Sequence, residues 1–286
     1  MSETEPIQLH ETLQPQPLPP EGPPLKDLVI LYLLSSVLLL VFGTLLQTWH
    51  LLIGLVVTEV VLVVGPPLLY TLWYRQNMAQ TFHLTPIRLK TALLVVVTTV
   101  AAFVLVGFVA LLQSLVFRPS QNYQDIWEHV FQQFQQIPVI IAVLVIAILP
   151  GICEELFFRG FLLRGFRNKT SDWSAIVLAG LLFGIFHFDI YRFFPVTLLG
   201  ILFGYIVVKT GSIFTGMIAH ATNNTIALLI AFAGSALRDK IPVSPQVPSE
   251  LPLLQMLIPL IVILMIALGV FFVGIHTLPR ASDARM

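Results

Sequence analysis

Residues 137–163 read IPVIIAVLVIAILPGICEELFFRGFLL, an apolar run that carries two adjacent glutamates and an arginine in its second half. The run exceeds the roughly 20 apolar residues that a helix needs to cross a bilayer core. Backbone groups cannot face lipid without a hydrogen-bonding partner, so such a run must be helical. The stretch therefore predicts a membrane-spanning helix with ionisable side chains inside it.

The composition of the whole chain extends this prediction to a polytopic membrane protein. Of 286 residues, 57% are hydrophobic and 10% are charged, whereas soluble domains carry about 25% charged residues. We expect an all-α fold with about eight transmembrane helices. The apolar segments lie near 28–46, 51–72, 91–117, 137–163, 174–188, 195–208, 213–232 and 253–273. The sixth segment is short and either spans the membrane or enters it partway.

The remaining sequence predicts a simple domain organisation. Residues 1–25 are acidic and Pro-rich without the basic start of a signal peptide, and predict a disordered cytoplasmic tail. Residues 26–278 form the membrane domain, with a motif-bearing core at 137–233, and 279–286 form a C-terminal tail. The 15 basic and 15 acidic residues balance, so nothing indicates nucleic acid. The single cysteine, Cys153, excludes an internal disulfide and a multi-Cys metal site, and we interpret it as a small packing residue.

The distribution of Lys and Arg predicts the orientation, because cytoplasmic loops carry the excess of these residues. A cytoplasmic N-terminus places on the inner side Lys26, Arg75, Arg88, Lys90, Arg164, Arg167, Lys169, Lys209, Arg280 and Arg285. The outer side then holds only Arg118, Arg192, Arg238 and Lys240. Both termini are therefore predicted to be cytoplasmic.

Ionisable groups inside the predicted spans are few, and they gather on three of them. Insertion of each costs about 3 kcal/mol, so such groups are functional by default. Glu154, Glu155 and Arg159 lie on the fourth span, His187 lies on the fifth, and His220 and Asn224 lie on the seventh. Glu155 and Arg159 are i,i+4 neighbours on one helical face, as are His220 and Asn224.

A depth argument brings these groups together. If the fourth and fifth spans turn near residues 169–172, Glu154 and His187 each lie roughly 24 Å from that turn at 1.5 Å per residue. His220 lies roughly 14 Å along the seventh span from the same side. We expect these side chains to share one cavity, which we predict to open toward the cytoplasm.

The ordered motifs Glu154-Glu155-x-x-x-Arg159, Phe183-x-x-x-His187 and His220-x-x-x-Asn224 resemble those of the CAAX prenyl protease and bacteriocin-processing family of intramembrane endopeptidases. The resemblance covers about residues 139–232. It implies that Glu154 is the general base and that His187 helps to position the water. It also implies that His220 and Asn224 donate hydrogen bonds to the oxyanion, although Asn223 could equally supply that amide.

The family resemblance leaves the cofactor and the substrate open. The family has been described both as metallopeptidase-like and as a metal-free glutamate protease. Two His and one Glu (Glu154, His187 and His220) could form a zinc site, but the strong zincin motif is absent, and we favour a metal-free site. The predicted partners are the bilayer and a membrane-associated peptide or protein. The family resemblance implies that this substrate is either a prenylated C-terminal peptide or a leader-bearing peptide.

Three other interpretations are compatible with the same residues. Intramembrane Glu and His also mark proton paths, so a proton-coupled transporter is one alternative, although no convincing internal repeat is present. A non-catalytic membrane protein that binds or regulates a partner is another. The third is that the charged residues Glu154, Glu155 and Arg159 only hold helices together. Under each of these interpretations, Glu155 and Arg159 are expected to form an internal ion pair.

Several sequence features outside the motifs also predict local structure. Residues 118–136 form either an amphipathic surface helix or a solvated loop. Gly180-x-x-x-Gly184 and Gly200-x-x-x-Gly204 predict close helix packing. Pro150-Gly151 is expected to bend or end its helix. No role is assigned to Glu59, which stands alone in the second span.

Overall fold

The computed structural model describes residues 23–238 and 253–282, and the predicted tails lie largely outside them. All the regular structure in these ranges is helical. Seven helices there are long and apolar enough to cross a membrane: Leu25–Trp49, Leu51–Trp73, Leu89–Val116, Val139–Arg167, Phe193–Thr210, Ile213–Leu237 and Leu257–Thr277. The prediction of a polytopic helical membrane protein is confirmed.

Several long helices are composites, in which short π-helical stretches (η) interrupt the α-helix. The first hairpin consists of α1 (Leu25–Leu38), η1 (Leu39–Gly43), α2 (Thr44–Trp49), α3 (Leu51–Val57), η2 (Thr58–Val63) and α4 (Gly65–Trp73). After α5 (Met78–Thr81) come α6 (Leu89–Val116) and α7 (Gln121–Gln135). The motif-bearing helix runs through α8 (Val139–Ala142), η3 (Val143–Ile148), α9 (Leu149–Glu155), η4 (Leu156–Leu163) and α10 (Arg164–Arg167). The last helices are α11 (Asp172–Phe186), α12 (Phe193–Thr210), α13 (Ile213–Arg238) and α14 (Leu253–Thr277).

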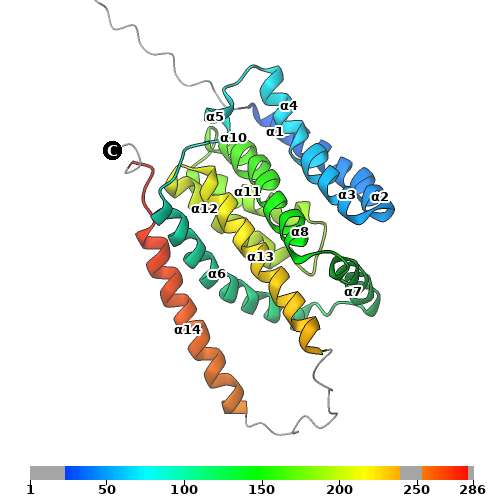
Figure 1. Cartoon of the computed structure of the whole chain (residues 1–286). Helices are drawn as coiled ribbons and strands as arrows, with labels where there is room; N and C mark the ends of the chain where they lie inside the picture. The colour runs from blue at the N-terminus through cyan, green and yellow to red at the C-terminus, as the bar shows by residue number, and fades with distance from the viewer. Residues whose placement is uncertain (1–22, 239–252, 283–286) are drawn as a thin grey trace, which may run out of the picture.

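The bundle has two distinct ends, which organise the rest of the molecule. The start of α1, α5, α10 and the end of α14 lie at one end, and α7 lies at the other (Figure 1). We call these the α10 end and the α7 end. The long helix α6 packs against α12, α13 and α14, and α13 packs against the composite helix that bears the Glu pair.

The fifth expected span forms α11, which is as long as the predicted segment 174–188 but is not among the seven helices long enough to cross a membrane. It contains 15 residues, or roughly 22 Å of helix, against a hydrocarbon core of about 30 Å. The sequence pointed to the sixth segment as the doubtful one, but that segment forms α12, an 18-residue helix. Because α11 starts at the α10 end and stops early, its last residues lie inside the bundle.

The predicted glycine packing is confirmed where α11 meets α12. A Cβ atom on Gly180 would lie 2.8 Å from the backbone nitrogen of Ile201, and one on Gly200 would lie 3.0 Å from the Cα atom of Gly180. No side chain fits at either position. The two backbones therefore approach closely, which fixes the hairpin that ends at the site.

The segment at 118–136 forms the amphipathic helix α7, which resolves the alternatives left open by the sequence. Ser120 caps its N-terminus by accepting a hydrogen bond from the backbone N–H of Tyr123 at 3.3 Å. Phe134 on its inner face is buried, while its charged and amide side chains are exposed. It is a surface helix that covers the end of the bundle (Figure 1).

Pro150 and Gly151 do not end the helix that contains them. Pro150 lies in the first turn of α9, directly after the π-helical η3. A proline is tolerated at the start of a helical segment, where its missing N–H would have no partner. Gly151 packs against α13, since a Cβ atom there would lie 3.1 Å from the backbone nitrogen of Ala221.

Candidate active site

The innermost part of the site is the ion pair between Glu155 and Arg159. Arg159 Nη1 donates to Glu155 Oε1 at 2.6 Å, and Arg159 Nη2 donates to the carbonyl oxygen of Gly200 at 2.9 Å. The guanidinium also lies 4.5 Å from the centroid of the Phe183 ring. Both charged side chains are fully buried. The predicted internal ion pair is therefore present, and it ties the helix of the Glu pair to α12 and α11.

His220 is held by the same carboxylate. Its Nδ1 lies 3.0 Å from Glu155 Oε1, and its Nε2 lies 3.9 Å from Glu154 Oε2. The imidazole packs between the rings of Phe183 and Phe203. The Glu155 carboxylate, which is paired with Arg159, can only accept a hydrogen bond. His220 Nδ1 therefore carries a proton and donates it to Glu155 Oε1. The ring is thereby oriented with Nε2 toward Glu154.

Glu154 lies on the boundary between two cavities. One, of about 540 Å³, is lined by the first hairpin, α7 and the chain between α11 and α12. The other, of about 400 Å³, lies under α7 and is lined by α9, α11, α12 and α13. Glu154 is 8% exposed, and its Oε2 atom has no hydrogen-bond partner. Glu154 thus lines both cavities and keeps one buried carboxylate oxygen without a hydrogen-bond partner.

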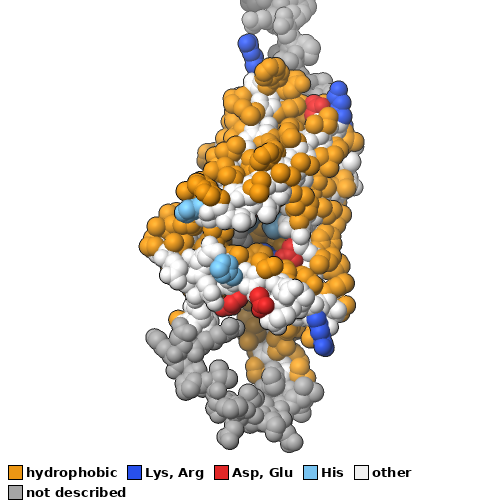
Figure 2. Space-filling model, turned by 90° about the vertical axis from the view of Figure 1, so that its right-hand side faces the viewer, with side chains coloured by type: hydrophobic (Ala, Val, Ile, Leu, Met, Phe, Trp, Pro, Cys, Tyr) orange, Lys and Arg blue, Asp and Glu red, His pale blue; other side chains and the backbone are white. Residues whose placement is uncertain are grey.

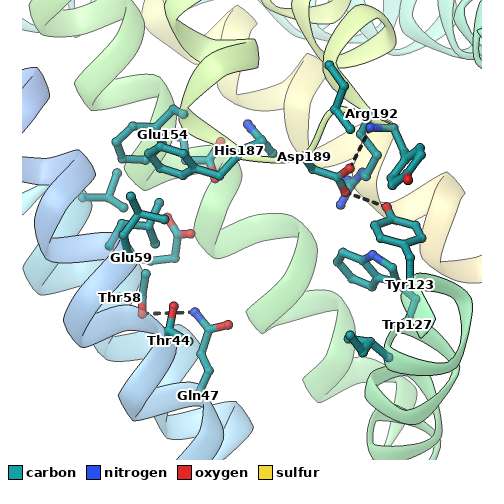
Figure 3. Close-up of a pocket in the computed structure, with 18 residues that line it drawn as sticks. Thr44, Gln47, Thr58, Glu59, Tyr123, Trp127, Glu154, His187, Asp189 and Arg192 are labelled. Carbon is teal, nitrogen blue, oxygen red and sulfur yellow. Dashed lines mark hydrogen bonds between the residues drawn. The ribbon is translucent and has the colours of Figure 1, made fainter. Parts of the chain in front are cut away.

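His187 lines both cavities with Glu154 and caps the short helix α11 (Figure 3). Its Nδ1 lies 2.9 Å from the carbonyl oxygen of Phe183. A carbonyl oxygen only accepts, so Nδ1 carries the proton, and Nε2 of the neutral ring can accept one. Phe188, with a φ of 49°, turns the chain out of the helix directly after this histidine.

Asn223 and Asn224 bring two side-chain amides to the second cavity. Asn224 Nδ2 lies 3.4 Å from the carbonyl oxygen of Ile146 in η3, and Asn223 Nδ2 donates to Asn224 Oδ1 at 3.1 Å. The structure therefore brings together all six residues that the sequence singled out, on α9, η4, α11 and α13. Either amide has an N–H to offer to a ligand in the cavity.

Sequence reasoning missed Glu59. This residue lies in η2, is 7% exposed, and lines the larger cavity with Glu154 and His187 (Figure 3). Its Oε2 atom has no hydrogen-bond partner. An isolated carboxyl group in an apolar span is by itself a sign of a functional residue. Nothing in the sequence, however, indicated that the second span lies beside the fourth, where Glu154 is.

The helix α7 is fastened over the cavity mouth by its contacts with the chain between α11 and α12. The Tyr123 hydroxyl donates to Asp189 Oδ2 at 2.6 Å, and the Arg192 guanidinium lies 5.4 Å from the centroid of the Trp127 ring. Partial burial and the hydrogen bond to Asp189 raise the pKa of Tyr123 to about 12. At the other end of α7, Gln135 Nε2 donates to Ser235 Oγ at 2.5 Å.

The sequence predicts an opening toward the cytoplasm, and it assigns the Lys- and Arg-rich end of the bundle to that side. The larger cavity lies toward the other end, because Tyr123, Ile126 and Trp127 of α7 and residues 186–192 line it together with the middle of the first hairpin. Figure 2 shows a recess in the side of the molecule, between a hydrophobic surface and an end rich in polar side chains. The depth estimate itself indicated this, since 24 Å from the α10 end of a core of about 30 Å is near the other face.

The three side chains that the sequence suggested as zinc ligands, Glu154, His187 and His220, all line the cavity under α7. Within residues 23–238 and 253–282, no three His, Cys, Asp or Glu side chains are arranged to hold a metal ion. Nδ1 of His187 faces the Phe183 carbonyl, and Nδ1 of His220 is engaged by Glu155, so the Nε2 atoms are the ones left to contact a ligand or a water.

Comparison with known proteins agrees with the motifs. Residues 136–226 match the family model described as type II CAAX prenyl endopeptidase Rce1-like. This range contains every motif residue of α9, η4, α11 and α13 described above. The resemblance to the CAAX prenyl protease and bacteriocin-processing family is thereby confirmed, and it supports a membrane protease in general.

Two relatives from Bacillus subtilis (strain 168) extend beyond the motif-bearing core. The chain is 29% identical over 152 residues to "Uncharacterized protein YyaK", covering 50% of this chain and 49% of that protein. It is 28% identical over 113 residues to "Putative membrane peptidase YdiL", covering 40% of this chain and 44% of that protein. The match thus spans about half the length of these relatives or less. No solved structure matches the chain.

Proposed function

We propose that the protein is a metal-free intramembrane endopeptidase, which hydrolyses a peptide bond of a membrane-associated substrate with water activated by Glu154. The observation that carries the proposal is the buried Glu154 carboxylate with a free oxygen at the junction of two cavities. Two imidazoles face the same junction. General bases need this combination of a defined position and a cavity for the substrate.

The hydrogen bonds of the two imidazoles support a different proposed role for each. His187 presents an unprotonated Nε2 and positions the water by accepting from it, while Glu154 takes the second proton of that water. The water oxygen bonds to the carbonyl carbon, the C–N bond breaks, and protonated Glu154 returns the proton to the leaving amine. No external acid or base is consumed in this cycle.

The proposed mechanism gives His220 the role of a hydrogen-bond donor. It acts as an imidazolium whose Nδ1–H is held by Glu155 and whose Nε2–H is available. In this form His220 Nε2–H, with an amide of Asn224 or Asn223, donates to the oxyanion of the transition state.

The proposed class of substrate is a peptide or protein segment that reaches the cavity from the membrane. Prenylated C-terminal peptides and leader-bearing peptides are the two forms implied by the family, and both belong in the test. The substrate library is incubated with detergent-purified protein, and the products are identified by mass spectrometry. Cleavage should be present in the wild type and absent in Glu154→Gln and His187→Ala.

Two controls make the assay decisive. Cys153→Ala alters the residue next to Glu154 without touching the proposed chemistry, and should cleave. A chelator should leave the wild-type rate unchanged, whereas inhibition by the chelator that zinc reverses would contradict the metal-free mechanism. A folded wild type that cleaves nothing, or a Glu154→Gln variant that cleaves normally, would overturn the proposal.

A further inference from the structure

The cavity and the basic side chains occupy opposite ends of the bundle. The chain between α11 and α12, which contains Asp189 and Arg192, lines the larger cavity together with α7. A third cavity, which Glu154 does not line, has about 680 Å³ and lies between α7 and the turn at His50. It shares Thr44, Gln47 and Ile126 with the larger of the two cavities at Glu154. The accessible volume around Glu154 therefore leads to the α7 end.

The described charges are strongly asymmetric along the bundle axis. The α10 end holds the basic residues Lys26, Arg75, Arg88, Lys90, Arg164, Arg167, Lys169, Lys209 and Arg280, with the acidic residues Asp27 and Asp172. The basic residues at the α7 end with described side chains are Arg118 and Arg192, and its acidic residues are Asp125, Glu128 and Asp189. An excess of Lys and Arg in short loops marks the cytoplasmic side.

We infer that the cavity opens on the non-cytoplasmic side of the membrane, and that the substrate is an exported or membrane-inserted polypeptide presented from that side. The part of the inference that concerns the substrate rests on the proposed peptidase function. The orientation of the cavity follows from the charge asymmetry and the cavity lining alone. A peptide that remains in the cytoplasm would meet the α10 end.

The two cavities at Glu154 both combine apolar walls with polar groups. The larger of the two carries hydroxyl and amide groups of Thr44, Gln47 and Thr58 beside apolar side chains of the first hairpin. The other sets Val130, Phe131 and Phe134 of α7 opposite His220, Asn223 and Asn224. A polypeptide segment with both apolar and polar side chains would find partners on either side of Glu154.

The first test uses the single cysteine of the chain. Cys153 is 4% exposed, so the wild type should resist a membrane-impermeant maleimide. Asn122→Cys on α7 and Gln47→Cys in the cavity should be labelled in intact spheroplasts of a bacterial host. Asn168→Cys, at the α10 end, should be labelled only after the membrane is permeabilised. The reverse pattern, or labelling of both ends in intact spheroplasts, would overturn the inference.

The second test separates sidedness from activity. A membrane-impermeant fluorogenic peptide, cleaved by the detergent-purified protein, is added to right-side-out spheroplasts and to inverted membrane vesicles. Cleavage should occur with spheroplasts, and should be lost with inverted vesicles until detergent opens them. Cleavage by intact inverted vesicles would overturn the inference while leaving the peptidase function standing. If the detergent-purified protein cleaves no peptide of the library, the peptidase function is refuted, and the cysteine labelling decides the orientation by itself.

Discussion

Glu155 and His220 are joined across two helices by a hydrogen bond of 3.0 Å between Oε1 and Nδ1. The same oxygen accepts from Arg159 at 2.6 Å. One carboxylate therefore neutralises the buried guanidinium and also fixes the orientation of the imidazole that faces Glu154. In the proposed mechanism, Glu155 acts through these two partners and does not touch the substrate.

The first prediction concerns the charge of Glu155. Glu155→Gln keeps the size of the side chain but leaves Arg159 buried without a counter-charge, which costs about 3 kcal/mol when one partner of a buried pair is removed. We expect a lower unfolding midpoint in detergent and the loss of peptide cleavage. Glu128→Gln, on the exposed face of α7, is the matched control and should change neither. An unchanged midpoint for Glu155→Gln would show that the ion pair does not stabilise the fold.

The second prediction uses the glycine that makes room for this carboxylate. A Cβ atom on Gly216 would lie 2.7 Å from Glu155 Oε2 and 2.7 Å from Val207 Cγ2. Gly216→Ala should displace Glu155 and lower the stability by about 1–3 kcal/mol, as other overpacked positions do, with reduced cleavage. Gly107→Ala in α6 provides the comparison, because nothing lies within 4 Å of its added methyl group. Equal effects of the two substitutions would contradict the predicted collision.

The third prediction is that Glu59 affects stability and activity in opposite directions. Its carboxyl group is buried in the cavity with an oxygen that lacks a hydrogen-bond partner. Since an ionisable group inside the membrane costs about 3 kcal/mol, a neutral isostere should be easier to bury. Glu59→Gln should therefore keep or raise the unfolding midpoint in detergent while lowering the cleavage rate. A lower midpoint with unchanged cleavage would instead identify Glu59 as a structural residue.

Much of the site could be predicted because its signals are local. The spacing of four between Glu155 and Arg159, and between His220 and Asn224, places each pair on one helical face whatever the rest of the fold. The apolar runs predicted the spans for the same reason. Glycine spacing likewise predicted close helix packing at 180–184 and 200–204, and the structure shows it where α11 meets α12.

The features that could not be predicted depend on how distant helices meet. The hydrogen bond from His220 to Glu155 joins residues on different helices, and no local pattern encodes it. The early end of α11, at Phe186, depends on the turn at Phe188 and on α7 covering that end. Glu59 is a carboxyl group in an apolar span and was therefore conspicuous in the sequence. Its place in the cavity could not be predicted, because Glu154, which lines the same cavity, lies on another helix. The opening of the cavity at the α7 end follows from these tertiary contacts.

The fourth prediction concerns the pH range over which the hydrogen bond from Tyr123 to Asp189 holds α7 against the chain between α11 and α12. The pKa of Tyr123 is raised to about 12 by burial and by the hydrogen bond to Asp189. A tyrosine in an unfolded chain ionises near pH 10. The folded pKa is the higher one, so the contribution of Tyr123 to stability is fully present below about pH 10 and is lost as the pH rises through 12.

Absorbance titration of the phenolate can test this assignment. The wild type should contain one more tyrosine that ionises near pH 12 than Tyr123→Phe does. Wild-type stability should also fall more steeply than that of the variant as the pH rises from 10 to 12. Identical titration curves and identical stability profiles would contradict a hydrogen bond that holds α7 over the cavity.

The rate of hydrolysis of a single peptide by Glu154→Gln, compared with Cys153→Ala, shows whether the Glu154 carboxylate is the base. The two substitutions are adjacent on one helix, so they perturb the packing of the same region, but only one removes the proposed base. Catalysis by Glu154 requires wild-type-like turnover for Cys153→Ala and no detectable turnover for Glu154→Gln, with both proteins folded in detergent. Turnover by Glu154→Gln close to that of the wild type would contradict it.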